Sequence, residues 1–190
     1  MKKIQLSTVL VMFTVAVVAL YLGNKLFELL KISIRNMDFT YINDSKKTQR
    51  WIDYMTPLAK EVGGKMGIPW QAMVVQTAIE TGWGKSSLFQ KYNNFGGIKA
   101  VGSQPSVSLG TTECGSNGCY QTTSKFRKWN TKYDGLIGYA QFFKDNGRYA
   151  TALKYPNDPY RFVEEIKKAG YATDPDYVAK LHGMLTKYFA

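Results

Sequence analysis

The sequence predicts an α+β fold, in which helices surround a small β region. Apolar residues recur at the three- and four-residue spacing of helices on both sides of residues 93–123. Residues 93–123 themselves hold six of the seventeen glycines, many Ser and Thr, and few helix formers, as is typical of short strands and turns. The order of helices, strands and helices favours a small β lobe attached to a mainly helical one.

The helices that precede the β region end at strong helix breakers. The first is expected over residues 48–66, with Pro57 inside the pattern as a start or a kink. Gly67 and Pro69 interrupt the pattern, and Pro69 suits the first turn of a second helix, which Gly82 would end.

The remaining elements follow from turn residues and renewed helical spacing. Strands are expected around residues 106–112 and 120–126, joined by the turn formers Gly-Ser-Asn-Gly at 115–118. Three further helices are expected over residues 133–146, 159–168 and 175–188.

A membrane anchor is expected before this domain. Lys2 and Lys3 precede about 19 mostly apolar residues ending at Leu22, enough for one transmembrane helix across about 30 Å of hydrocarbon. A cleaved signal peptide, which would leave a secreted protein, is the alternative, but no small-residue cleavage site follows. The positive-inside rule places the rest of the chain outside the cytoplasmic membrane, in the periplasm or cell wall. Residues 1–37 are therefore assigned to the anchor and juxtamembrane segment, and residues 38–190 to the folded domain.

The charge and residue types restrict the chemistry. The formal net charge is +11, and residues 38–190 hold 20 basic and 13 acidic side chains, which favours a polyanionic partner such as nucleic acid, anionic lipid or cell wall. No nucleic-acid motif supports the first, so we expect no nucleic-acid partner. The single histidine, His182, excludes a His-rich metal site and leaves acid–base chemistry to carboxylates and tyrosines. We expect neither a cofactor nor a metal.

Glu80 is the first candidate for chemistry. It falls in the last turn of a predicted helix, where the helix dipole disfavours negative charge by about 0.3–1 kcal/mol, and Ile79 and Trp83 are close in sequence. Both influences raise a carboxyl pKa, and a carboxylic acid that is protonated near neutral pH can donate to a leaving oxygen. A solvated surface glutamate is the more common alternative.

Several blocks of sequence resemble the glucosaminidase family of peptidoglycan hydrolases, which includes flagellar and autolysin-type enzymes. The strongest are QTAIETGWGKS at 76–86 and KYNNFGGIK at 91–99. Further blocks in the same order are Thr112-Glu113, residues 126–129, residues 146–149 and residues 170–175, so that the resemblance spans about residues 48–188. Phe95-Gly96 and Asp134-Gly135 depart from the family pattern and are expected to alter the groove.

The resemblance implies a lysozyme-like fold, with a mainly helical lobe and a small β-hairpin lobe flanking a groove. It implies an endo-β-N-acetylglucosaminidase that cuts the β-1,4 bond after N-acetylglucosamine in peptidoglycan glycan strands. By position, Glu80 matches the catalytic acid, Glu113 a proposed partner acid, and Tyr171 a tyrosine lining the site. The expected substrate-binding residues, each also readable as a packing residue, are Trp83, Asn94, Trp129, Tyr133 and Tyr149.

Two other functions stay open at this point. A muramidase or lytic transglycosylase would share the fold and the acid. A non-catalytic wall-binding module, anchored in an envelope-spanning apparatus, would share the location and the membrane attachment. Intact Glu80 and Glu113 favour an enzyme.

Cys114 and Cys119 are the only cysteines. A redox motif and half of a metal site are the alternatives to a disulfide, but Cys-x-x-Cys spacing is absent and no histidine is near. Outside the membrane a disulfide is favoured. It would close the hairpin tip, stabilise it by about 2 kcal/mol, and stiffen the strand that carries Glu113.

Overall fold

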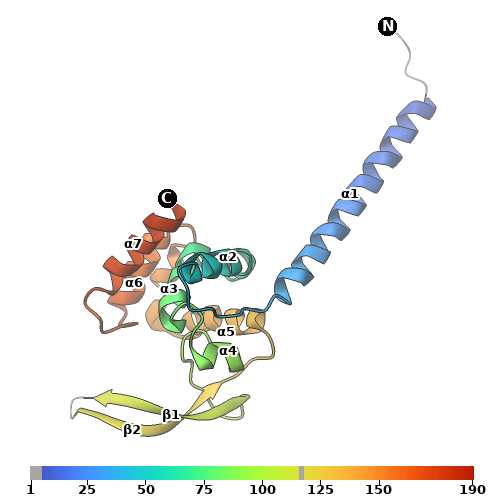
Figure 1. The fold of residues 1–190 in the computed structure, drawn as a ribbon. Helices are drawn as coiled ribbons and strands as arrows, with labels where there is room; N and C mark the ends of the chain where they lie inside the picture. The colour runs from blue at the N-terminus through green and yellow to red at the C-terminus, as the bar shows by residue number, and fades with distance from the viewer. Residues whose placement is uncertain (1–5, 116–117) are drawn as a thin grey trace. The chain divides into compact units, whose positions relative to one another are not determined.

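The computed structural model describes residues 6–115 and 118–190, with side chains described for residues 17–112 and 118–190 (Figure 1). The chain divides into two compact units, which meet in sequence between Asn36 and Met37. The described part of the first unit is a single helix, α1 (Leu6–Arg35). Within the described ranges, none of the helices combines the length and apolar character needed for crossing a membrane. The first two residues of the expected anchor, Ile4 and Gln5, lie outside the described residues, and the anchor stays a prediction.

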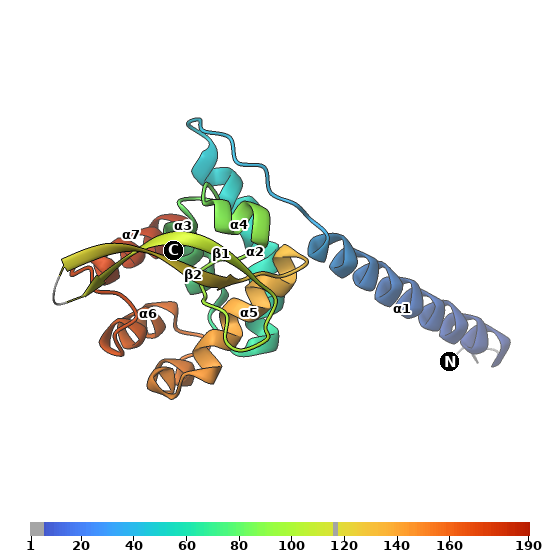
Figure 2. The same cartoon turned by 90° about the horizontal axis from the view of Figure 1, so that it is seen from below.

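The second unit has the α+β architecture that the sequence predicts. Its helices and strands are, in order, α2 (Lys47–Met66), α3 (Trp70–Thr81), α4 (Ser87–Tyr92), β1 (Ser106–Gly115), β2 (Gly118–Arg127), α5 (Lys132–Asp145), α6 (Pro159–Lys168) and α7 (Tyr177–Phe189). Two 3₁₀ turns, η1 (Gly147–Tyr149) and η2 (Ala152–Lys154), lie between α5 and α6. The strands form one antiparallel hairpin, which projects from the group of helices (Figure 1; seen from below in Figure 2).

Aromatic side chains from α2, α4 and the loop after α4 form part of the core. The rings of Trp51, Phe89 and Phe95 are almost fully buried, and their successive centroids lie 5.3 and 4.9 Å apart in edge-on contacts. Trp51 also donates its indole N–H to the carbonyl of Val74 on α3, at 3.2 Å. Each such buried ring stabilises the fold by about 1.5–3 kcal/mol through apolar burial alone. This cluster therefore joins α4, which the sequence analysis did not predict, to the helical body.

The hairpin is held to the helices at its base. In the register, Ser106 lies opposite Arg127 and Cys114 opposite Cys119. At the base, the buried amide of Asn94 donates to the carbonyls of Ile98 and Arg127, at 2.9 and 2.8 Å, and accepts from the Ile98 N–H at 3.0 Å. Beyond this point the described hairpin side chains are exposed or half-buried. The position of the hairpin thus depends on its base.

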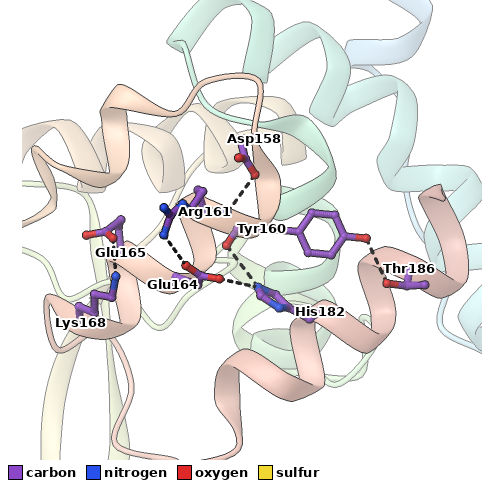
Figure 3. Close-up of polar contacts among 8 residues, drawn as sticks. All are labelled: Asp158, Tyr160, Arg161, Glu164, Glu165, Lys168, His182 and Thr186. Atoms are coloured by element: carbon purple, nitrogen blue, oxygen red, sulfur yellow. Dashed lines mark hydrogen bonds and ion pairs between the residues drawn. The ribbon is translucent and has the colours of Figure 1, made fainter.

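Polar contacts on α6 and α7 accompany the packing of these two helices (Figure 3). The imidazole of His182 on α7 lies 3.3 Å from the carbonyl oxygen of Tyr160 on α6, and the Tyr160 hydroxyl lies 3.1 Å from that of Thr186. Arg161 pairs with Glu164 at 3.2 Å along α6, an exposed contact that adds little to stability. Below them Phe162, Ile166 and Leu181 are fully buried. These contacts and the shared core hold α6 against α7.

Candidate functional site

Glu80 is placed by the way α3 ends. Gly82 adopts a left-handed conformation, with φ 59°, which suits a residue without Cβ, and the N–H of Trp83 returns to the carbonyl of Ala78 at 2.7 Å. The Thr81 hydroxyl donates to the Thr77 carbonyl at 2.6 Å and accepts from the Gly84 N–H at 2.9 Å. The last turn that carries Glu80 is therefore fixed by the helix cap, as the sequence predicts for Gly82.

Glu80 lines a cavity of about 210 Å³. The other lining residues come from the loop after α4, from α5, from η1 and from the segment after α6: Gly96, Gly97, Ile98, Tyr139, Phe142, Arg148, Tyr149 and Tyr171. Three residues that the sequence analysis selected, Glu80, Tyr149 and Tyr171, thus meet in one place. They come from widely separated parts of the chain.

The pKa of the Glu80 carboxyl is raised above its ordinary value. Desolvation by burial is the main cause, and a hydrogen bond from the Tyr171 side chain partly opposes it. The residue as a whole is exposed on the surface of α3, while its side chain also lines the cavity. Its carboxyl is therefore desolvated without being sealed from substrate, and it stays protonated to a higher pH than a solvated glutamate.

Tyr171 is held between Glu80 and the core. Its hydroxyl lies 3.2 Å from that of Tyr139, and its ring stacks on Phe143 with centroids 5.5 Å apart. Burial raises the pKa values of both tyrosines well above the ordinary range, and the negative charge of Glu80 raises that of Tyr171 further. Both phenols are therefore neutral near pH 7, and Tyr171 acts as a hydrogen-bond donor to the carboxylate.

The segment that carries Tyr171 is fixed by backbone contacts. The Tyr171 N–H donates to the carbonyl of Ile166 at 3.0 Å. The ammonium group of Lys167 donates to the carbonyls of Ala172 and Asp174, at 2.8 and 2.6 Å. These contacts set the tyrosine on a rigid support, which favours a defined geometry toward Glu80.

The two departures from the family pattern have local reasons. A Cβ at Gly96 would lie 2.8 Å from the ring of Tyr139, so the glycine gives that ring its place in the cavity wall. Phe95 beside it is buried in the core. A Cβ at Gly135 would lie 1.9 Å from the carbonyl oxygen of Asn93, so α5 can approach the loop after α4 only with glycine there. The first departure therefore shapes the cavity, and the second lets α5 pack closely against the loop after α4.

The other expected substrate-binding residues lie outside the lining of this cavity. Asn94 is buried and holds the hairpin base, and Tyr133 is buried with its hydroxyl donating to Glu61 at 3.2 Å. Trp83 packs against Tyr188, and Trp129 packs against α5 at Gly138. The contacts of these four residues within the protein are those of packing or positioning residues. Their contact with a ligand stays a prediction.

Three cavity residues, Tyr139, Phe142 and Arg148, were missed by the sequence analysis. Tyr139 and Phe142 stand three residues apart on α5, a spacing that also fits ordinary core packing. Arg148 is exposed, and its guanidinium lies 4.7 Å from the ring centre of the fully buried Tyr149. Its place directly before Tyr149 in a matched block was the one available signal.

The side chains of Glu113 and Cys114 lie outside the described residues. The backbone places Glu113 on β1 opposite Tyr120, next to the facing pair Cys114 and Cys119. The predicted roles of Glu113 and of the cysteine pair therefore stay predictions.

Comparisons with known proteins give a consistent result. Residues 56–190 match the glucosaminidase family, described as mannosyl-glycoprotein endo-beta-N-acetylglucosaminidase. The peptidoglycan hydrolase FlgJ of Pseudomonas aeruginosa is 35% identical over 138 residues, which are 69% of this chain and 34% of that protein. The chain spans about a third to just over half the length of several curated relatives it matches.

Solved structures agree with the fold. A C-terminally truncated glycoside hydrolase domain of Salmonella typhimurium FlgJ superposes with a TM-score of 0.60 at 27% identity, over 74% of this chain and 96% of that one. The catalytic domain of the autolysin Auto from Listeria monocytogenes gives 0.67 at 23% identity, over 86% and 94%, a likeness of fold alone.

The contact between Tyr171 and Glu80 predicts the direction of a pKa change. Tyr171→Phe removes the hydrogen bond that lowers the Glu80 pKa, so this pKa should rise further, while Tyr149→Phe, whose hydroxyl is not a cause of the shift, should leave it unchanged. Titration of the Glu80 side-chain carboxyl carbon by NMR measures both. An unchanged or lowered pKa in Tyr171→Phe would contradict the contact.

Proposed function

The chain belongs to the glucosaminidase family, and we propose that it is a peptidoglycan hydrolase that cuts the β-1,4 bond after N-acetylglucosamine in glycan strands. The observation that carries the proposal is Glu80, a carboxyl of raised pKa in the wall of an aromatic-lined cavity. It stands at the acid of the family motif. Relatives described as peptidoglycan hydrolases support the substrate class.

In this proposal Glu80 is the general acid. It protonates the glycosidic oxygen while positive charge develops on the sugar ring in an oxocarbenium-like transition state. The raised pKa favours the protonated form of the carboxyl, which is the form that a general acid needs. When the proton has left, the Tyr171 hydroxyl donates to the new carboxylate and stabilises it. The aromatic walls supply the flat, amphipathic surfaces that a sugar ring contacts.

The second half of the reaction has two possible sources of assistance. Glu113 on β1 would act as a base toward water or as electrostatic support, at a carboxyl separation of about 5 Å for a nucleophile or about 6.5–9.5 Å for a base acting through water. Alternatively the acetamido group of the substrate assists, and Tyr171 orients it. The hairpin that carries Glu113 is attached through its base, so its position relative to Glu80 depends on Asn94.

The first test is Glu80→Gln. Loss of the acid should lower kcat on purified peptidoglycan at least about 100-fold, with no loss in the free energy of unfolding, because the amide avoids a desolvated charge. Glu164→Gln on α6 (Figure 3) is the matched control and should keep wild-type activity, because Glu164 does not line the cavity. Undiminished hydrolysis by Glu80→Gln would refute the proposal.

Mass spectrometry of the wild-type products identifies the bond that is cut. Products that end in N-acetylglucosamine would support the proposed specificity. A muramic acid reducing end would instead identify the enzyme as a muramidase, and an anhydro product would identify it as a lytic transglycosylase.

Glu113→Gln separates the two routes of the second half-reaction. If Glu113 is the base, kcat should fall about 100-fold or more while KM changes little. Near-normal turnover would instead support assistance by the substrate acetamido group. Gln121→Glu, at an exposed neutral position of β2, controls for a general effect of hairpin charge.

Location and the cysteine pair belong to the same proposal. We infer that residues 1–37 attach the protein to the cytoplasmic membrane and that the domain works outside it, where peptidoglycan lies. An oxidising compartment permits a disulfide, and Cys114 and Cys119 face each other across the hairpin tip. This bond would stiffen the strand end next to Glu113. The same membrane segment would attach the enzyme to an envelope-spanning apparatus.

One cell experiment tests the location and the bond together. The full chain should sediment with membranes, be degraded by protease added outside the cytoplasmic membrane, and carry no thiol that alkylates before reduction. Soluble recovery of the full-length chain would contradict the anchor. Alkylation of both cysteines without reductant would contradict the disulfide.

A further inference from the structure

A second cavity adjoins the one that contains Glu80. It has a volume of about 250 Å³ and shares Ile98 and Phe142 with the first cavity as a common wall. Its other lining residues come from the hairpin base, the loop before it and α5: Lys99, Val101, Gln104, Arg127, Gly138, Asp145 and Asn146. None of the residues expected to bind substrate lines it. A polymer that is cut at Glu80 extends beyond the first cavity, and this neighbour is a place for the part that does not react.

Arg127 gives the second cavity an oriented positive charge. Its guanidinium lies 5.0 Å from the ring centre of Trp129, and that ring is fixed against α5, since a Cβ at Gly138 would lie 2.3 Å from it. The backbone of Arg127 is bonded to Ile98 and to Asn94. The side chain is thus held at the hairpin base by packing, with little freedom to lose when a ligand binds.

The guanidinium of Arg127 has unused hydrogen-bonding capacity. Its Nε is buried without a hydrogen-bond partner, and the described part of the chain holds no acidic side chain paired with it. A buried donor left unpaired destabilises the fold, and the side chain that carries it lines the second cavity, where an anionic ligand can approach the guanidinium. Guanidinium groups bind carboxylates through two parallel N–H donors.

The same cavity also holds a negative charge. Asp145 is an exposed carboxylate at the end of α5 that accepts from the Gln141 amide at 2.6 Å. Apolar surface from Ile98 and Phe142 is in the same lining as Arg127 and Asp145. A cation, an anion and an apolar wall together suit a short peptide that carries both a carboxylate and an ammonium group. A bare sugar ring would leave both charges unused.

We propose that this second cavity binds the peptide substituent of the glycan strand, with the Arg127 guanidinium on a peptide carboxylate and Asp145 on a peptide ammonium group. The inference rests on the proposed function, because peptidoglycan is a glycan whose sugars carry short peptides. Binding there would make the enzyme prefer peptide-bearing strands to bare ones. Arg148 over Tyr149 adds positive charge in the neighbouring cavity.

The test compares two forms of one substrate: peptide-bearing glycan strands and the same strands after an amidase has removed the peptides. For full-length Arg127→Met, KM on peptide-bearing strands should rise about tenfold with kcat within about twofold, and KM on bare strands should stay unchanged. Arg127→Lys should recover part of the loss, and Lys65→Gln on α2 controls for net charge at an exposed position. An equal rise of KM on both substrates would show that Arg127 acts only through the hairpin base. Unchanged KM on both would also overturn the proposal.

A binding measurement separates this inference from the proposed function. Soluble stem peptide titrated into the wild-type chain should shift the Arg127 Nε–H signal in an NMR spectrum, and Asp145→Asn should weaken the binding. If the wild type cuts no glycan at all, the proposed hydrolase function fails, and the Arg127 signal still decides whether the cavity binds peptide. No shift at saturating peptide would refute the site.

Discussion

The candidate site depends on a desolvated carboxyl in an aromatic-lined cavity, and none of the described cations is among the causes of its pKa shift. The described causes of the Glu80 pKa shift are desolvation and one neutral hydroxyl, that of Tyr171. Desolvation disfavours the charged form of this carboxyl, so its position must be enforced by the rest of the fold. The Gly82 cap fixes the helix turn that carries Glu80. The walls of the cavity around it come from α5, η1 and the segment after α6. Desolvation of the Glu80 carboxyl is locally unfavourable for folding, and packing in the core offsets it.

The position of the hairpin depends on hydrogen bonds at its base. One buried amide, Asn94, satisfies two carbonyls and one N–H at the point where the strands leave the helices. The same strand residue, Arg127, offers its carbonyl to Asn94 and its guanidinium to the second cavity. The hairpin base and the proposed peptide site therefore share Arg127, so a shift of the strand would also move its guanidinium.

Much of the fold could be predicted because its signals are local. Gly67 and Gly82 end helices, and the turn formers at 115–118 separate two strands, since these residues decide backbone conformation where they stand. The helix α4 was missed because six residues are too short to show a helical period. Glu80 and Tyr171 could be selected from motif blocks, but not their contact, which requires the tertiary packing of α6 on the core.

Tyr139 and Arg127 show why the rest of the site escaped prediction. An aromatic residue on a helix commonly serves core packing, and a basic residue on a strand is commonly solvated. The sequence next to Tyr139 and Arg127 contains no signal that they line a cavity. Their roles arise from glycines elsewhere: Gly96 gives room to the ring of Tyr139, and Gly138 to the ring of Trp129 on which Arg127 stacks. A side chain at either glycine would displace a wall of one cavity or the other. The shape of both cavities is thus encoded partly in residues that have no side chain.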